Sequence, residues 1–121
     1  MKHTHNPNHA VTLYRTESGR VNLCTCCKDL ELAFKSIRMG FSRESLCDLQ
    51  CYVSGIDLSQ GAQEPGLARY CIYFRNFPLV LTYHYEEILE LRQLLEESLF
   101  ALELHEFLHL SGIESNPAQN G

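Results

Sequence analysis

Residues 105–112 of this 121-residue chain read HEFLHLSG and contain the pattern H-E-x-x-H. On a helix, His105 and His109 lie one turn apart on the same face, and Glu106 lies beside them. In zinc hydrolases the two histidines of this pattern hold the metal, while the glutamate activates a metal-bound water. The pattern therefore suggests a zinc-dependent hydrolase of the metallopeptidase type that uses His105, Glu106 and His109.

Two features of the sequence weaken the hydrolase hypothesis. A catalytic zinc needs a third protein ligand, and the longer metzincin pattern would supply it at position 115, where this chain has Ser115. The surrounding residues 86–110 are also rich in Glu, Leu and His, so the pattern arises easily by chance. An accident of composition, a structural metal site and a catalytic site all stay open.

Cysteines form a second group that could bind metal. Cys24 and Cys27 have C-x-x-C spacing, which lets two thiolates reach one ion from a tight turn. Together with His105 and His109 they would complete a closed Cys₂His₂ site, so these four residues are the predicted ligands of a structural zinc. The alternative is that the two cysteines only pack. Packing in the core is the interpretation for Cys47, Cys51 and Cys71.

Composition restricts the classes of partner. Hydrophobic residues make up 45% of the chain and charged residues 21%, as in an ordinary globular domain. The net charge of −5 argues against a broad nucleic-acid surface and against binding to anionic membranes. The chain has no apolar stretch that could span a bilayer, and its polar start lacks a signal-peptide core. We therefore expect a cytoplasmic protein whose cysteines stay reduced.

Strands are predicted in three hairpins. Residues 11–24 alternate between apolar and polar side chains around a turn at 17–19. Residues 30–42 and 70–82 align with each other at an offset of forty, and each consists of an apolar strand, a short polar break and a second apolar strand. The predicted turns of these two hairpins are Lys35-Ser36 and Arg75-Asn76.

Helices are predicted after the second and third hairpins. Ser42 and Thr82 are suited to cap them. Apolar residues then recur at helical spacing: Leu46, Leu49 and Val53 in the first helix, and Ile88, Leu91, Leu95, Leu99 and Leu102 in the second. The prediction is an α+β fold, a mainly antiparallel sheet with two helices, built from two ββα units at 30–53 and 70–110 plus an N-terminal hairpin. A single domain would span 11–114, between a flexible arm at 1–10 and a flexible tail at 115–121.

The first half of the chain resembles an uncharacterised family of small bacterial proteins, a domain of unknown function. In that family C-x-x-C precedes a hairpin with a strand ending in Phe, and a Ser or Thr precedes a helix. The matching positions here are Cys24, Cys27, Leu32, Phe34, Ser36, Met39, Phe41 and Ser42. The likeness covers about residues 11–54, a third of the chain, and the turn Lys35-Ser36 replaces the family's Gly-Asn. It implies a small cytoplasmic domain and no particular activity.

The second predicted helix is apolar around much of its circumference, through Leu94, Leu95, Leu99, Phe100, Leu102, Leu104, Phe107 and Leu108. A small sheet can cover one side of such a helix, and the other side needs a partner. Homodimerisation through this helix is the simplest arrangement. The sequence thus favours a binding or assembly module, with or without a structural zinc, over an enzyme.

Overall fold

The computed structural model describes residues 9–63, 69–74 and 78–111. Its elements in chain order are β1 (Ala10–Arg15), β2 (Gly19–Cys24), β3 (Leu30–Phe34), β4 (Ile37–Phe41), α1 (Arg43–Ser54), α2 (Ser59–Gln63), β5 (Arg69–Tyr73), β6 (Val80–His84) and α3 (Tyr85–Ser111). The strands form a four-stranded antiparallel sheet in the order β1-β2-β3-β4 and a separate β5-β6 hairpin. The fold class is therefore α+β, as predicted.

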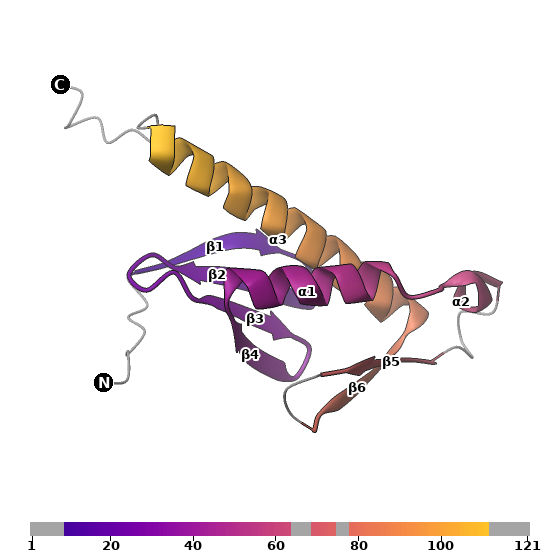
Figure 1. Ribbon diagram of the computed structural model, residues 1–121. Coiled ribbons are helices and arrows are strands. Elements are labelled where there is room, and N and C mark those ends of the chain that lie inside the picture. The colour runs from indigo at the N-terminus through magenta and orange to yellow at the C-terminus, as the bar shows by residue number, and fades with distance from the viewer. Residues whose placement is uncertain (1–8, 64–68, 75–77, 112–121) are drawn as a thin grey trace.

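The long helix α3 and the shorter α1 lie against the same face of the four-stranded sheet (Figure 1). Alternation of side chains decides which face they cover, since Val21 and Leu23 of β2 and Leu32 and Phe34 of β3 are all buried there. The predicted apolar stripes of both helices complete this core. Burying each such side chain contributes roughly 1.5–3 kcal/mol.

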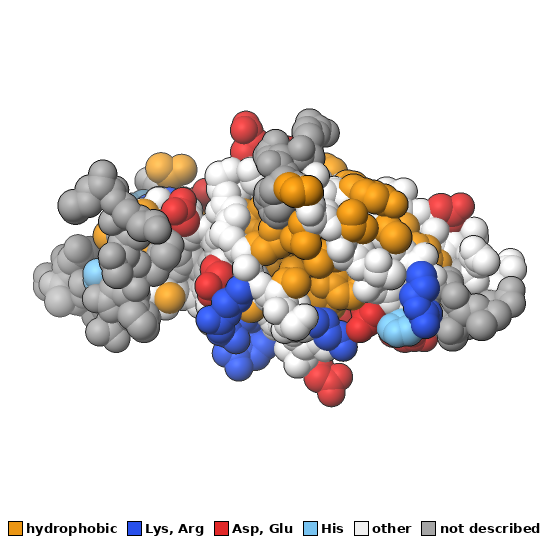
Figure 2. Space-filling view, turned by 90° about the horizontal axis from the view of Figure 1, so that it is seen from below, with side chains coloured by type: hydrophobic (Ala, Val, Ile, Leu, Met, Phe, Trp, Pro, Cys, Tyr) orange, Lys and Arg blue, Asp and Glu red, His pale blue; other side chains and the backbone are white. Residues whose placement is uncertain are grey.

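The β5-β6 hairpin closes one end of the core instead of extending the sheet. Phe34 and Tyr83 meet edge to face, with ring centroids 5.3 Å apart. The Tyr52 hydroxyl of α1 also binds the backbone of β5, by accepting from the Tyr73 N–H at 3.3 Å. On this side, hydrophobic side chains form a continuous area in the middle of the molecule (Figure 2). Ile37 of β4 and Leu81 of β6 are partly buried and pack against the core.

Several local predictions are confirmed. The N-terminal hairpin forms, and Lys35 takes a positive φ of 56° in the two-residue turn between β3 and β4. Ser42 caps α1, because its hydroxyl oxygen accepts the Ser45 N–H at 3.1 Å.

Other predictions need correction. The strands make two sheets rather than one, and the structure shows no repeat. Two residues connect β3 to β4, whereas residues 74–79 connect β5 to β6, so the forty-residue offset is not kept. Thr82 lies within β6 and does not cap α3. The His84 N–H donates to the Glu87 carboxylate at 2.7 Å at the start of that helix instead.

The ends of the chain fall largely outside the described residues, as does the predicted turn Arg75-Asn76. The short helix α2 was not predicted from the sequence. No helix within the described ranges is long and apolar enough to cross a membrane.

Candidate functional site

The C-x-x-C segment forms the tight turn that its spacing predicts. The Lys28 N–H donates to the Cys24 carbonyl at 2.7 Å, and Lys28 takes a φ of 68°. Cys24 is buried and Cys27 half-buried. Desolvation raises the pKa of the Cys27 thiol; a hydrogen bond with the Asp29 backbone opposes this increase in part, and the neighbouring Cys24 adds to it. A neutral thiol is a weaker nucleophile and metal ligand than a thiolate.

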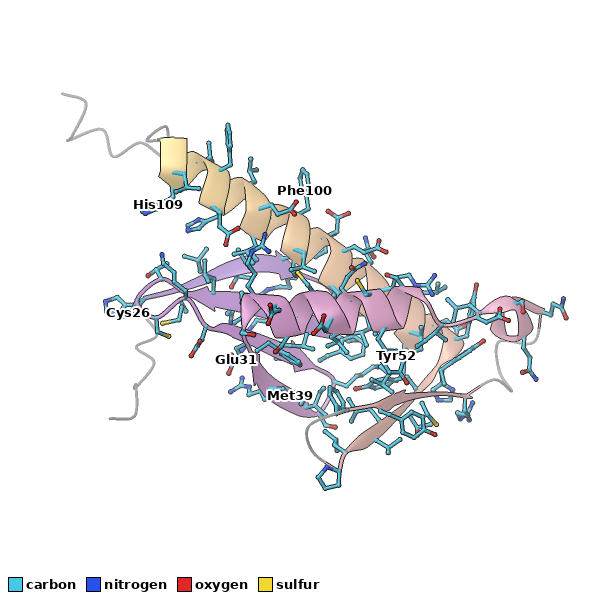
Figure 3. The ribbon with its side chains drawn as sticks, viewed as in Figure 1. Cys26, Glu31, Met39, Tyr52, Phe100 and His109 are labelled. Atoms are coloured by element: carbon cyan, nitrogen blue, oxygen red, sulfur yellow. The ribbon has the colours of Figure 1, made fainter. Side chains whose placement is uncertain are left out.

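The two histidines of H-E-x-x-H lie on the last turns of α3. His105 is half-buried and His109 exposed. This end of α3 and the cysteine turn lie at the same end of the molecule, where Figure 3 labels His109 and Cys26. Within residues 9–63, 69–74 and 78–111, however, no group of three or more His, Cys, Asp or Glu residues is arranged to hold a metal ion. The predicted zinc site at Cys24, Cys27, His105 and His109 therefore stays a prediction.

Glu106 makes a contact that bears on the hydrolase hypothesis. The Arg43 Nε donates to both Glu106 carboxylate oxygens at 3.1 Å, and an Arg43 terminal nitrogen lies 4.0 Å from Glu103. A glutamate that activates a zinc-bound water must place its carboxylate beside the metal. Here the carboxylate is directed at the start of α1, so its visible role is to tie the end of α3 to that helix.

The prediction that three further cysteines pack in the core is wrong for two of them. Cys51 and Cys71 are exposed, and Cys47 is half-buried. On α1 the buried residues are Leu46, Leu49 and Val53, which lie on one side of the helix. Cys51 lies on the opposite, outer side. On β5 the residues on either side of Cys71 point into the core, so Cys71 points outward.

Near its other end, α3 is held to the β1–β2 turn by the carboxylate of Glu90. The Ser18 N–H donates to the Glu90 side chain at 2.7 Å. Burial alone would raise the pKa of Glu90, but hydrogen bonds from Thr16 and Ser18 hold it below its usual value. The turn and the helix are thereby held in one arrangement.

Hydrophobic side chains remain exposed along the second half of α3. Phe100, Leu104 and Phe107 are 65%, 49% and 60% exposed, and their spacing of four and three residues places them on one helical face. Phe100 points away from both α1 and the sheet (Figure 3). The wide apolar circumference of this helix was visible in the sequence, but only the packing identifies which side stays uncovered.

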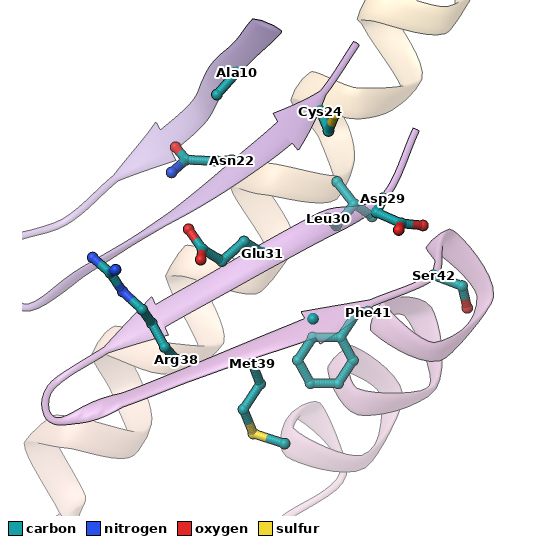
Figure 4. Close-up of a pocket in the computed structure, with 11 residues that line it drawn as sticks. Ala10, Asn22, Cys24, Asp29, Leu30, Glu31, Arg38, Met39, Phe41 and Ser42 are labelled. Atoms are coloured by element: carbon teal, nitrogen blue, oxygen red, sulfur yellow. The ribbon is translucent and has the colours of Figure 1, made fainter. Parts of the chain in front are cut away.

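The open face of the four-stranded sheet, opposite α3, carries polar side chains over a shallow hollow of about 500 Å³. Asn22, Glu31 and Arg38 extend from three neighbouring strands on this side (Figure 4). The Thr12 hydroxyl donates to Asn22 Oδ1 at 2.8 Å. Sequence reasoning missed this surface, although the alternation of polar and buried residues on β2 and β3 is its signal.

No curated protein and no solved structure matches this chain. A family model does match, over residues 7–120. The resemblance seen in residues 11–54 thus extends over nearly the whole chain, including α2, the β5-β6 hairpin and α3. The protein belongs to the family of unknown function DUF6686.

Proposed function

We propose that the protein is a small assembly module that pairs with a second copy of itself through the second half of α3. The observation that carries this proposal is the exposure of Phe100, Leu104 and Phe107 on one face. Keeping such side chains in water costs about 25 cal/mol for each Å² of apolar surface. Clustered apolar surface of this kind is typical of interaction sites.

The spacing of the three side chains suits a symmetric pair. Phe100 precedes Leu104 by four residues and Phe107 follows it by three. If two α3 helices pack antiparallel about a twofold axis near Leu104, each Leu104 meets its copy. Phe100 then packs against the partner subunit's Phe107. Such a self-complementary contact is the usual basis of a homodimer.

The charges beside Phe100, Leu104 and Phe107 predict how the proposed dimer depends on salt. Glu103 would approach its copy near the twofold axis, which is unfavourable. Arg43 lies 4.0 Å from Glu103 in the same chain and offsets part of that repulsion. Because salt screens the remaining repulsion, dimerisation should strengthen moderately as ionic strength rises. A partner with basic flanks would show the opposite dependence.

Sedimentation of the tag-free protein tests the proposal. We expect dimers at concentrations on the order of 100 µM, which corresponds to a weak but specific association. Leu104→Glu places two carboxylates at the twofold axis and should give monomers. Leu89→Glu is the matched control, since Leu89 is 38% exposed on the same helix and lies outside the proposed contact. A monomeric wild type, or equal loss in both variants, would contradict the proposal.

Metal binding and a cytoplasmic location stay predictions. Metal content by mass spectrometry, in wild type and in Cys24→Ser and His105→Ala, tests the first. One zinc per chain that is lost in both variants would support the shared site. The tight turn at Cys24–Cys27 supports this prediction, whereas no group of three or more possible ligands forms within the described residues.

A further inference from the structure

Three arginines lie in a single row across the four-stranded sheet. Arg15 of β1 is directly opposite Arg20 of β2, Arg20 is opposite Ala33 of β3, and Ala33 is opposite Arg38 of β4. Residues that are opposite each other on neighbouring strands point to the same face. Val21, next to Arg20, is buried under α3, so this row lies on the open face.

This arrangement brings like charges together on one face of the sheet. The chain has a net charge of −5 and only ten Lys and Arg residues, yet three of them share one row. Like charges directly opposite each other on paired strands are destabilising. In the part of the chain that the structure describes, Lys35 and Arg43 form ion pairs, whereas none of Arg15, Arg20 and Arg38 forms one. The row therefore concentrates positive charge that no ion pair within the described residues offsets, although Glu17 and Glu31 lie on the same side of the sheet.

The row lines a hollow of about 340 Å³, a volume within the range of small-molecule sites. Other residues that line it are Thr16, Glu17, Ser18, Lys35 and Ser36. Thr16 and Ser18 already bind Glu90, so Ser36 is the residue that adds a hydroxyl group beside the guanidinium groups. Glu17 is the one carboxylate in the lining, and the charge of Lys35 is offset by Glu87 at 3.3 Å.

Ala33 leaves space at the centre of the row. Neighbouring strands lie about 4.8 Å apart, so the Cα atoms of Arg20 and Arg38 are separated by roughly 10 Å. Only a methyl group stands between them. Two long arginine side chains can converge over that methyl group on a single oxyanion, and a guanidinium matches the geometry of phosphate with two parallel hydrogen bonds.

We propose that this row binds the phosphate group of a small molecule, a phosphate ester or a diphosphate, seated over Ala33 between Arg20 and Arg38. Arg15 would reach the same group from the sheet edge. Glu17 in the hollow and Glu31, on the same open face, would repel a long polyanion. The site thus suits a compact anion better than a nucleic-acid backbone, which needs an extended basic surface.

Calorimetric titration at low salt, with inorganic pyrophosphate as the probe, tests this site. We expect one saturable site per chain. Arg20→Gln and Arg38→Gln should each weaken binding about tenfold to a hundredfold, because each removes hydrogen bonds to a charged group. Ala33→Leu fills the space over the row and should abolish binding while leaving all the charges. Circular dichroism establishes that each variant is folded.

Lys28→Gln is the control, since it removes one exposed cation beyond the opposite end of β2. Equal weakening by Lys28→Gln would show unspecific attraction and overturn the proposal. Absence of saturable binding in a folded wild type would also overturn it. A parallel titration with a sugar phosphate separates a phosphate ester from a free diphosphate. Binding seen only with oligonucleotides, and increasing with their length, would assign the row to nucleic acid instead.

Discussion

Gly19→Ala should destabilise the fold because β2 packs very closely against its neighbours at this position. A Cβ atom on Gly19 would lie 2.5 Å from the Ala33 carbonyl oxygen, 2.9 Å from Phe34 Cδ1 and 3.1 Å from Leu94 Cδ2. A rotated side chain cannot relieve the shortest contact, because it involves the backbone of the paired strand. The strand itself must shift, next to the Ser18 N–H that binds Glu90.

The size of the effect follows from two opposing contributions. Forcing extra atoms into a close-packed site costs roughly 1–3 kcal/mol, and a backbone clash belongs at the upper end of that range. Replacing glycine by alanine also restricts the unfolded chain, which stabilises the fold by about 0.4–1 kcal/mol. The net expectation for Gly19→Ala is a loss of about 2 kcal/mol in the free energy of unfolding.

Gly40→Ala is the matched comparison. The nearest atom to a Cβ at Gly40 is the Leu30 carbonyl oxygen at 3.9 Å, an ordinary contact. This variant should therefore be more stable than the wild type by about 0.4–1 kcal/mol. Urea unfolding followed by circular dichroism should separate the two midpoints by about 1 M or more. If the two variants differ by less than about 0.5 kcal/mol, the close approach of β2 to β3 and α3 is refuted.

Three further outcomes can be measured by the same unfolding assay. Ser42→Ala removes the cap of α1 and should cost about 1 kcal/mol, whereas an unchanged stability would show that the hydroxyl is dispensable. The pKa of Glu90 is lowered in the folded protein, so its contribution is present above its unfolded pKa of about 4.3 and is lost as the pH falls through the folded value. Glu90→Gln should therefore flatten the decline in stability below about pH 4.3, and an unchanged pH profile would count against the Ser18 contact. Arg43 and Glu106 side chains are 46% and 41% exposed, so Arg43→Gln should cost no more than about 1 kcal/mol, decreasing with added salt. A loss that salt does not reduce would mean that Arg43 acts by packing.

The hydrophobic sequence pattern of individual elements was sufficient to predict most of them. Val21 and Leu23 alternate with polar residues as a half-buried strand requires, and the spacing of Leu46, Leu49 and Val53 specifies the buried side of α1. The caps were less reliable, since Ser42 was identified correctly and Thr82 was not. The reason is that β6 stays paired with β5 for two residues beyond Thr82, through Tyr83 and His84. This pairing with a distant strand outweighs the local preference of threonine for a cap.

The sequence by itself therefore determined the class of fold and the main buried apolar positions of α1, β2 and β3, because these depend on interactions between residues close along the chain. The tertiary structure decided everything that depends on distant pairs. It places Arg43 against Glu106 across 63 positions and thereby turns the glutamate of H-E-x-x-H toward α1. It also aligns Arg15, Arg20 and Arg38 through the register of four strands. Spacing along a chain cannot reveal such contacts, since strand register and helix docking are set by the packing of the whole core.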